Sequence, residues 1–261
     1  MSPPDAELPL IVYLHGRGDR PRVPRDDVYD LDTPVRMILP RGPERFGQGY
    51  AWAPVSAHRG ESPELLEALD ARARMLSDAM VEWQRRHPTR GRPIVLGFSQ
   101  GGILAMTLAV REPGSIARAI PMAGWLPPSL LPPRADRYAV NARVIALHGG
   151  DDPVLSATRT AGTVEDLVKL GYPVELEVYP GVGHEVSRDM RRRVHELLGG
   201  GAPRAARAPR VRRRGVARAE PQAASEAFCP RGGQDACAEV PLVYPPSPHT
   251  RGRRWRRSGW S

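Results

Sequence analysis

The sequence predicts an α/β fold in which helices flank a mostly parallel β-sheet. Short apolar runs of strand length recur along residues 1–199, and segments with helical spacing of apolar residues separate them. Strands that alternate with helices in this way form a parallel sheet covered on both faces. Ligand-binding groups gather at the carboxyl ends of the strands in such a sheet. We therefore expect functional residues directly after strands.

The predicted strands are short and mostly apolar. Runs of this kind indicate buried strands. They lie at residues 8–14, 35–39, 93–98, 117–124, 142–149 and 174–179.

The clearest predicted helix begins at Ser62. A capping serine, Pro63 in the first turn and the acidic Glu64 near the positive helix end are typical of a helix start. Apolar residues then recur at three-, four- and seven-residue spacings until His87-Pro88 ends the pattern. Further helical segments are predicted at residues 102–110, 163–171 and 187–200.

The net charge of the chain lies in its last segment. Residues 200–261 contain 13 Arg, no Lys and four acidic residues, which gives +9, whereas residues 1–199 contain 25 basic and 25 acidic residues. The apolar pattern also stops after Leu198, where Arg, Ala, Pro and Gly become dominant. The sequence therefore predicts one domain at residues 1–199 and a disordered, basic, Arg/Pro/Gly-rich tail at residues 200–261.

Two other interpretations of this tail stay open. Arg, Ala, Pro and Gly have GC-rich codons, so a frame-shifted segment of a GC-rich gene would have this composition. A stop codon in another reading frame near Gly199 would support that hypothesis. The Arg clusters, together with Trp255 and Trp260, are also compatible with a nucleic-acid-binding arm, which is the less favoured interpretation.

The composition disfavours membrane and secreted classes. No apolar run approaches the roughly 18 residues of a membrane helix. The N-terminus lacks a basic region followed by a long apolar run, which a secretory signal would have. Both cysteines, Cys229 and Cys237, lie outside the predicted domain, which therefore has no disulfide. We expect a cytoplasmic protein.

A candidate nucleophile lies between a predicted strand and a predicted helix. Gly97-Phe98-Ser99-Gln100-Gly101 matches the pattern G-x-S-x-G in the context that this motif needs. A tight turn exposes the serine hydroxyl, the glycines leave room for strand and helix to approach, and the helix N-terminus favours an oxyanion. Alone, the pattern is also compatible with a serine that only forms a turn.

A base and an acid follow later strands in the expected order. A serine nucleophile needs a histidine base and a carboxylate that orients it, and this architecture has them in the order Ser, Asp or Glu, His. Asp151 and Asp152 follow the strand at 142–149, and His184 lies in the glycine-rich loop after the strand at 174–179. The spacing alone leaves both aspartates open.

Two backbone N–H groups are candidates for an oxyanion hole. One belongs to Gln100, which follows the nucleophile, and the other belongs to Arg17 in the glycine-rich loop after the first strand. His15 in the same loop is better explained as a packing residue than as a catalytic one.

Seven motifs together resemble one family. LHGRGD, LPRGP, GYAWAP, GFSQGG, GWLP, HGGDDPV and GVGH, in this order, are similar to the carboxylesterase/phospholipase family of α/β-hydrolases, which includes acyl-protein thioesterases and small bacterial esterases. The resemblance covers residues 8–198. It implies an α/β-hydrolase fold without a large lid domain and a serine hydrolase that acts on esters or thioesters.

The resemblance also implies individual roles. The nucleophile motif of the family falls on Ser99, its G-x-x-H motif on His184 and its H-G-x-x-D motif on Asp152, which selects that aspartate over its neighbour. Its oxyanion residues fall on Arg17 and Gln100.

The sequence departs from the family pattern at two places, and the role of one further residue stays open. The family usually has a small or apolar residue in place of Arg17, whose side chain would bring positive charge near the acyl pocket. Residues 20–34 carry three prolines where the family has a solid helix, so this helix is expected to be reduced. Trp52 is a candidate for lining the substrate groove, and a packing role is an equal alternative.

The sequence therefore predicts a Ser99-Asp152-His184 esterase that works through an acyl-enzyme, with no metal and no cofactor. Its partner would be a small-molecule or lipid ester or thioester, and its oligomeric state stays undetermined. The alternatives are a peptidase on the same fold and a protein that binds nucleic acid through its tail.

Overall fold

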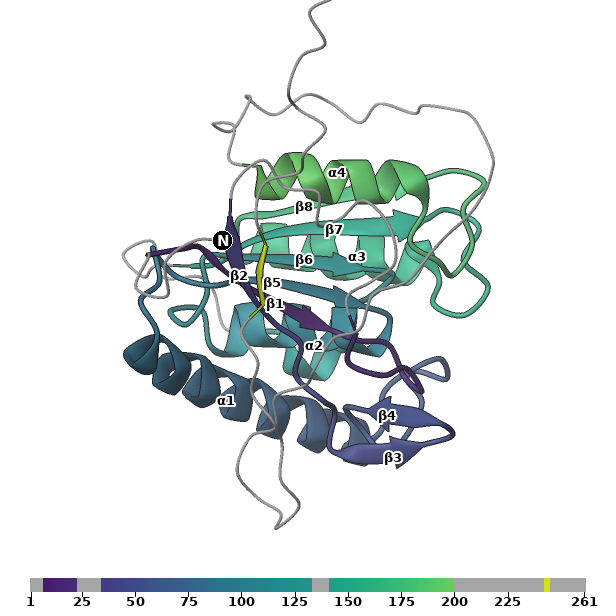
Figure 1. The fold of residues 1–261 in the computed structure, drawn as a ribbon. Helices are drawn as coiled ribbons and strands as arrows, with labels where there is room; N and C mark the ends of the chain where they lie inside the picture. Colours follow the sequence, from purple (N-terminus) through teal and green to yellow (C-terminus); the bar gives the residue numbers. More distant parts are fainter. Residues whose placement is uncertain (1–6, 23–33, 133–140, 200–241, 245–261) are drawn as a thin grey trace, which may run out of the picture.

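The computed structural model describes residues 7–22, 34–132, 141–199 and 242–244. A seven-stranded sheet in the order β8-β7-β6-β5-β1-β2-β9 forms its centre (Figure 1). Neighbouring strands are parallel except for β2 and β9, which are antiparallel. The predicted α/β fold with a mostly parallel sheet and flanking helices is confirmed.

Six strands lie where the sequence predicts them, with ends that differ by up to two residues. Their apolar residues are largely buried, and the more exposed pattern of β8 fits its position at the edge of the sheet. The strands are β1 (Leu10–Leu14), β2 (Val35–Ile38), β5 (Ile94–Phe98), β6 (Arg118–Met122), β7 (Arg143–Gly149) and β8 (Val174–Tyr179).

The four α-helices overlap the predicted helical segments, whereas the 3₁₀ helix was not predicted. Ser62 caps the first of them, since its Oγ accepts a hydrogen bond of 3.2 Å from the N–H of Leu65. The predicted segment at 163–171 is the end of a helix that begins earlier, after the capping residue Ser156. The helices are α1 (Pro63–Arg86), α2 (Gln100–Arg111), α3 (Ala157–Lys169), α4 (Arg188–Leu198) and the short 3₁₀ helix η1 (Pro128–Leu130).

Alternate residues of the central strands pack against different helices. Leu10, Val12 and Leu14 of β1 belong to the core that contains α1, α2 and α3. Ile11 and Tyr13 belong to a second core, on the other face, together with α4. This alternation follows from the two-residue period of a strand, and it explains why apolar residues occupy every position of β1.

The structure contains a small hairpin that the sequence did not predict. β3 (Glu44–Phe46) and β4 (Gly49–Ala51) pair only with each other, and they contain no apolar run that would predict strands. Two backbone hydrogen bonds tie this hairpin to the loop after β1: the N–H of Gly18 donates to the carbonyl of Tyr50 at 2.7 Å, and the N–H of Tyr50 donates to Asp19 at 2.8 Å. The hairpin therefore lies against the predicted oxyanion loop.

Of the predicted tail at residues 200–261, the structure describes residues 242–244. Leu242–Tyr244 form the short strand β9, which pairs with the outer edge of β2. An apolar, β-prone triplet can add to an open strand edge in this way. The rest of residues 200–261, both cysteines and the proline-containing segment 23–33 lie outside the described residues. Across the described part of the chain, no helix is long and apolar enough to span a membrane.

Candidate active site

The strand order creates a switch point between β1 and β5. The chain passes from β1 to β2 on one side, and the later strands are added on the other side of β1, beginning with β5. Loops leave the sheet in opposite directions at such a point, which opens a crevice at the carboxyl ends of the strands. Arg17 follows β1, Ser99 follows β5, Asp152 follows β7 and His184 follows β8.

Ser99 occupies a strained backbone turn. Its φ of 55° and ψ of −120° place it in a region that residues with a side chain rarely adopt, directly before the first residue of α2. Flanking glycines permit the turn: a Cβ atom on Gly97 would clash with the carbonyl of Gly101, and one on Gly101 would clash with the carbonyl of Leu14. The turn thus presents the hydroxyl at the helix N-terminus, as the motif predicts.

Ser99, His184 and Asp152 form a continuous hydrogen-bonded chain. The Oγ of Ser99 lies 2.8 Å from Nε2 of His184, and Nδ1 of His184 lies 2.7 Å from Oδ2 of Asp152. An ionised carboxylate only accepts hydrogen bonds, so Nδ1 carries the proton and Nε2 is free to accept from the serine hydroxyl. This tautomer is the one that a general base needs.

The two neighbouring aspartates lie in different surroundings. The side chain of Asp152 is buried, whereas Asp151 is exposed and uses its backbone N–H to bond the carbonyl of Val182 at 3.0 Å. The loop after β7, which carries Asp152, lies very close to the loop after β8, which carries His184. A Cβ atom on Gly149 of the first loop would clash with the carbonyl of Gly183 in the second. Asp152, and not Asp151, therefore faces His184.

The environment keeps Asp152 ionised. Burial raises the pKa of this carboxyl group, but hydrogen bonds from His184 and from the N–H groups of Leu155 and Val154 outweigh burial, so the pKa lies below its ordinary value. The two backbone N–H groups donate to Oδ1 at 2.9 and 2.8 Å, which leaves Oδ2 for the imidazole.

A second histidine supports the same aspartate, and the sequence analysis did not single it out. His148 is completely buried, and its Nε2 donates to the carbonyl of Leu155 at 2.7 Å while lying 3.3 Å from Oδ2 of Asp152. Its Nδ1 lies 3.0 Å from the hydroxyl of Thr160. Since Leu155 also donates its N–H to Asp152, His148 holds the loop that carries the acid.

The two oxyanion candidates lie on opposite sides of the switch point. Gln100 is the first residue of α2, and a helix provides no internal acceptor for its first N–H groups. Arg17 lies in the loop after β1. The preceding residue of this loop, Gly16, is close to Ser99, since a Cβ atom on Gly16 would be 3.6 Å from Cβ of Ser99. The guanidinium carbon of Arg17 lies 3.5 Å from the ring centre of Phe46 on the hairpin.

The side chain of Gln100 has a role that the sequence analysis missed. Its Oε1 accepts a hydrogen bond of 2.8 Å from the N–H of Trp52, and its Nε2 donates to the carbonyls of Ala53 and Val55 at 3.3 and 3.1 Å. This buried amide therefore fastens the loop after β4 to the nucleophile turn. The signal was present in the sequence only as a glutamine beside the serine.

Trp52 packs in the core and does not line a groove. It has no exposed surface, and its Nε1 donates to the carbonyl of His15 at 2.8 Å. His15 is also buried: its Nδ1 bonds the carbonyl of Gly16 at 2.7 Å and its Nε2 accepts from the N–H of Gly42 at 3.0 Å. Of the two roles considered for Trp52, its burial agrees with packing. His15 is likewise a packing residue of the loop after β1.

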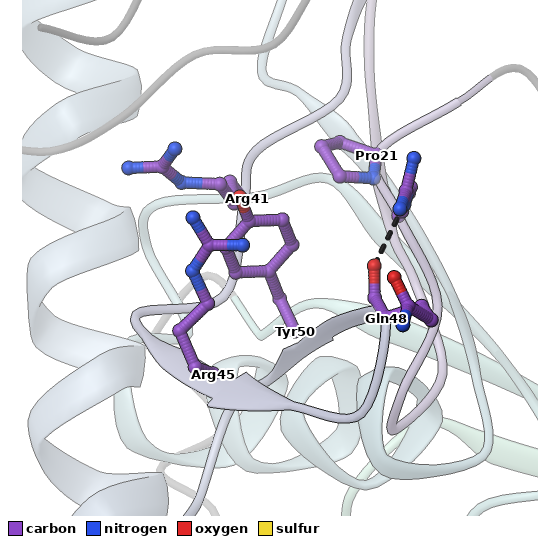
Figure 2. Close-up of a pocket in the computed structure, with 6 residues that line it drawn as sticks. Pro21, Arg41, Arg45, Gln48 and Tyr50 are labelled. Carbon is purple, nitrogen blue, oxygen red and sulfur yellow. Dashed lines mark hydrogen bonds between the residues drawn. The ribbon is translucent and has the colours of Figure 1, made fainter.

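An open pocket of about 370 Å³ lies beside the hairpin (Figure 2). Figure 2 shows Arg41 and Arg45 grouped around Tyr50, with Pro21 and Gln48 across from them. We call this site the arginine pocket; it is lined by Arg20, Pro21, Arg41, Arg45, Gln48 and Tyr50.

No metal site accompanies the candidate triad. Within the residues that the structure describes, no group of three or more His, Cys, Asp or Glu side chains is arranged to hold a metal ion. Ser99 and Asp152 are linked through His184, which bonds each of them.

The fold and the bonded Ser-His-Asp arrangement define an α/β-hydrolase. Residues 1–199 match the family model described as Phospholipase/Carboxylesterase. The chain belongs to this family of esterases and thioesterases, as its motifs suggested.

Known relatives match most of the domain. Esterase YpfH of Escherichia coli K12 is 26% identical over 192 residues, which cover 71% of this chain and 79% of that protein. The acyl-protein thioesterase 1 homolog 2 of Dictyostelium discoideum is 25% identical over 201 residues, covering 72% and 90%. The crystal structure of esterase PE8 superposes with a TM-score of 0.60 at 22% identity, covering 74% of this chain and 92% of that one, and supports the fold.

Proposed function

We propose that this protein hydrolyses carboxylic esters or thioesters through an acyl-enzyme on Ser99. The observation that carries the proposal is the continuous chain from Oγ of Ser99 through His184 to Asp152, at 2.8 and 2.7 Å. Membership of an esterase and thioesterase family supports the same reaction class.

The proposed mechanism has two acyl-transfer steps. His184 takes the proton of Ser99 as the hydroxyl attacks the substrate carbonyl, and the imidazolium then gives this proton to the leaving alcohol or thiol. Water attacks the acyl-enzyme in the second step with the same proton transfers. Asp152 keeps the imidazole in its Nδ1-protonated form and stabilises the charged intermediate.

The backbone N–H groups of Arg17 and Gln100 are proposed to stabilise the oxyanion. Their positions support this role, since Arg17 follows Gly16, which is close to Ser99, and Gln100 is the first residue of α2, next to Ser99. Removing one donor of this kind typically slows turnover by about 10²–10³. Residues 1–199 would thus be the catalytic domain, and a cytoplasmic location stays a prediction.

The test is hydrolysis of p-nitrophenyl esters from acetate to palmitate by the wild type, Ser99→Ala and Ser115→Ala. Ser115 is a matched control because its hydroxyl only bonds the carbonyl of Glu112 in a turn. We expect activity in the wild type and the control, and a loss of roughly 10⁶ in Ser99→Ala. Equal activity in Ser99→Ala would overturn the proposal, and cleavage of peptides without ester hydrolysis would favour the peptidase alternative.

A further inference from the structure

We propose that the substrate of this site carries an anionic group, a carboxylate or a phosphate, which the arginine pocket and Arg17 bind. The inference rests on the proposed function, because it assigns a charge preference to the same site. It follows from three arginines without an acidic partner, two of which line the arginine pocket, from the attachment of this pocket to the loop of Arg17, and from the size of the pocket.

Three guanidinium groups in this region have no acidic partner. In the described part of the chain, no carboxylate forms an ion pair with Arg17, Arg20 or Arg45. Arg17 stacks on Phe46, Arg45 lies 4.8 Å from the ring centre of Tyr50, and Nε of Arg20 donates to a backbone carbonyl at 2.7 Å. The buried Nε of Arg17 has no hydrogen-bond acceptor at all.

Among the described residues, the acids of this loop and of the hairpin, Asp19 and Glu44, are already paired with other arginines. Asp19 pairs with Arg22 at 3.1 Å, and Glu44 pairs with Arg72 at 3.1 Å. Arginines on the helices are mostly paired as well, such as Arg111 with Asp70. Within the described residues, three guanidinium groups without an acidic partner therefore lie at the hairpin and the adjoining loop. Such cationic groups attract anions.

The arginine pocket is attached to the loop that approaches the nucleophile. Arg20 follows Arg17 by three residues, which limits their Cα atoms to a separation of roughly 10 Å. The hydrogen bonds between Tyr50 and residues 18 and 19 hold the hairpin against this loop. The pocket and the loop that approaches Ser99 are thus joined through the same hairpin, which supports a shared substrate.

The pocket suits a small anion. Its volume of about 370 Å³ lies near the lower limit for ligand sites. A guanidinium group binds a carboxylate or phosphate through two parallel hydrogen bonds, and an aromatic ring under its face leaves the N–H groups at its edge available. Arg45 over Tyr50 has this arrangement, seen in Figure 2.

The experiment compares charge-matched esters with the full-length protein. For the acyl side, we would measure kcat/KM for p-nitrophenyl pentanoate, the glutarate half-ester, its phosphonate analogue and a trimethylammonium analogue. For the alcohol side, 4-acetoxybenzoate is compared with its methyl ester. Comparison of the glutarate half-ester with its phosphonate analogue distinguishes a preference for a carboxylate from a preference for a phosphate.

We expect the wild type to prefer the anionic member of at least one pair by about tenfold, mainly through a lower KM, and to disfavour the cation. This preference should fall in Arg20→Gln and Arg45→Gln, invert in Arg45→Glu and weaken with added salt. Arg192→Gln is the control, since this arginine lies on α4 and pairs with Asp189. It should keep the wild-type ratio.

The outcomes separate the two proposals. Hydrolysis of the neutral ester with no anionic preference in either pair overturns this inference and leaves the proposed function intact. A preference that persists in both glutamine variants and in Arg45→Glu also overturns it. A folded protein that hydrolyses none of these esters counts against the proposed function itself.

Discussion

Nε2 of His148 lies 3.3 Å from Oδ2 of Asp152, the same oxygen that bonds Nδ1 of His184 at 2.7 Å. The carboxylate of Asp152 thus lies near two imidazole rings. One belongs to His184, which bonds Ser99, and the other belongs to the buried His148. His148 also bonds the carbonyl of Leu155, whose N–H donates to Oδ1 of the same aspartate. The acid is therefore positioned by a residue that does not touch the candidate nucleophile.

His148→Ala should lower kcat by roughly tenfold with little change in KM. The substitution leaves the buried carbonyl of Leu155 without its donor, which costs on the order of 1–3 kcal/mol and loosens the loop of Asp152. His148→Gln should recover part of the activity, since its amide can donate to Leu155. Ester kinetics across pH, with exposed His58→Ala as control, would test this; wild-type kcat in His148→Ala would contradict a positioning role.

Gln100→Ala should reduce stability more than substitution of the less buried Gln84 does. It keeps the backbone N–H but leaves the N–H of Trp52 and the carbonyls of Ala53 and Val55 without partners, at a cost of roughly 1–3 kcal/mol. Gln84→Ala is the control, because that amide bonds Thr89 and Gly91 near the surface. The midpoint of urea unfolding would be measured for both variants. Equal midpoints would argue against the anchoring role of Gln100.

Gly101→Ala should destabilise the domain by roughly 1–3 kcal/mol or more, because the new methyl group meets the rigid carbonyl of Leu14. Gly114→Ala is a matched control, since a Cβ atom there contacts nothing within 4 Å. Thermal unfolding of both variants tests the need for close approach between α2 and β1. Similar unfolding temperatures would show that the turn can relax.

His15 should make the protein less stable below about pH 6.5. Burial lowers its pKa, and protonation would remove the acceptor that Nε2 offers to the N–H of Gly42. Its folded-state pKa is below the unfolded value, so the unfolded chain binds the proton first and stability falls as the pH drops from about 6.5 toward the folded pKa. His15→Gln should therefore show a smaller loss of melting temperature between pH 7.5 and 5 than the wild type, whereas an equal loss would exclude His15 as the source.

Much of the architecture could be predicted because its signals are local. The apolar runs of β1 and β5, the cap at Ser62 and the glycines around Ser99 each restrict the backbone within a few residues. The hairpin at residues 44–51 could not be predicted in this way, because its short strands depend on hydrogen bonds to the distant loop at residues 18 and 19.

The sequence by itself determined the fold class, the order along the chain of six strands and four helices, and the positions of the candidate serine, acid and base. Only the tertiary structure decided which neighbours those residues have. It buried Trp52, placed His148 behind Asp152, gave the side chain of Gln100 three backbone partners and gathered the arginines at the hairpin. Except for His148 with Asp152 and for Arg41 and Arg45 with Tyr50, these contacts join segments 20 or more residues apart, so their geometry depends on the packing of the whole sheet.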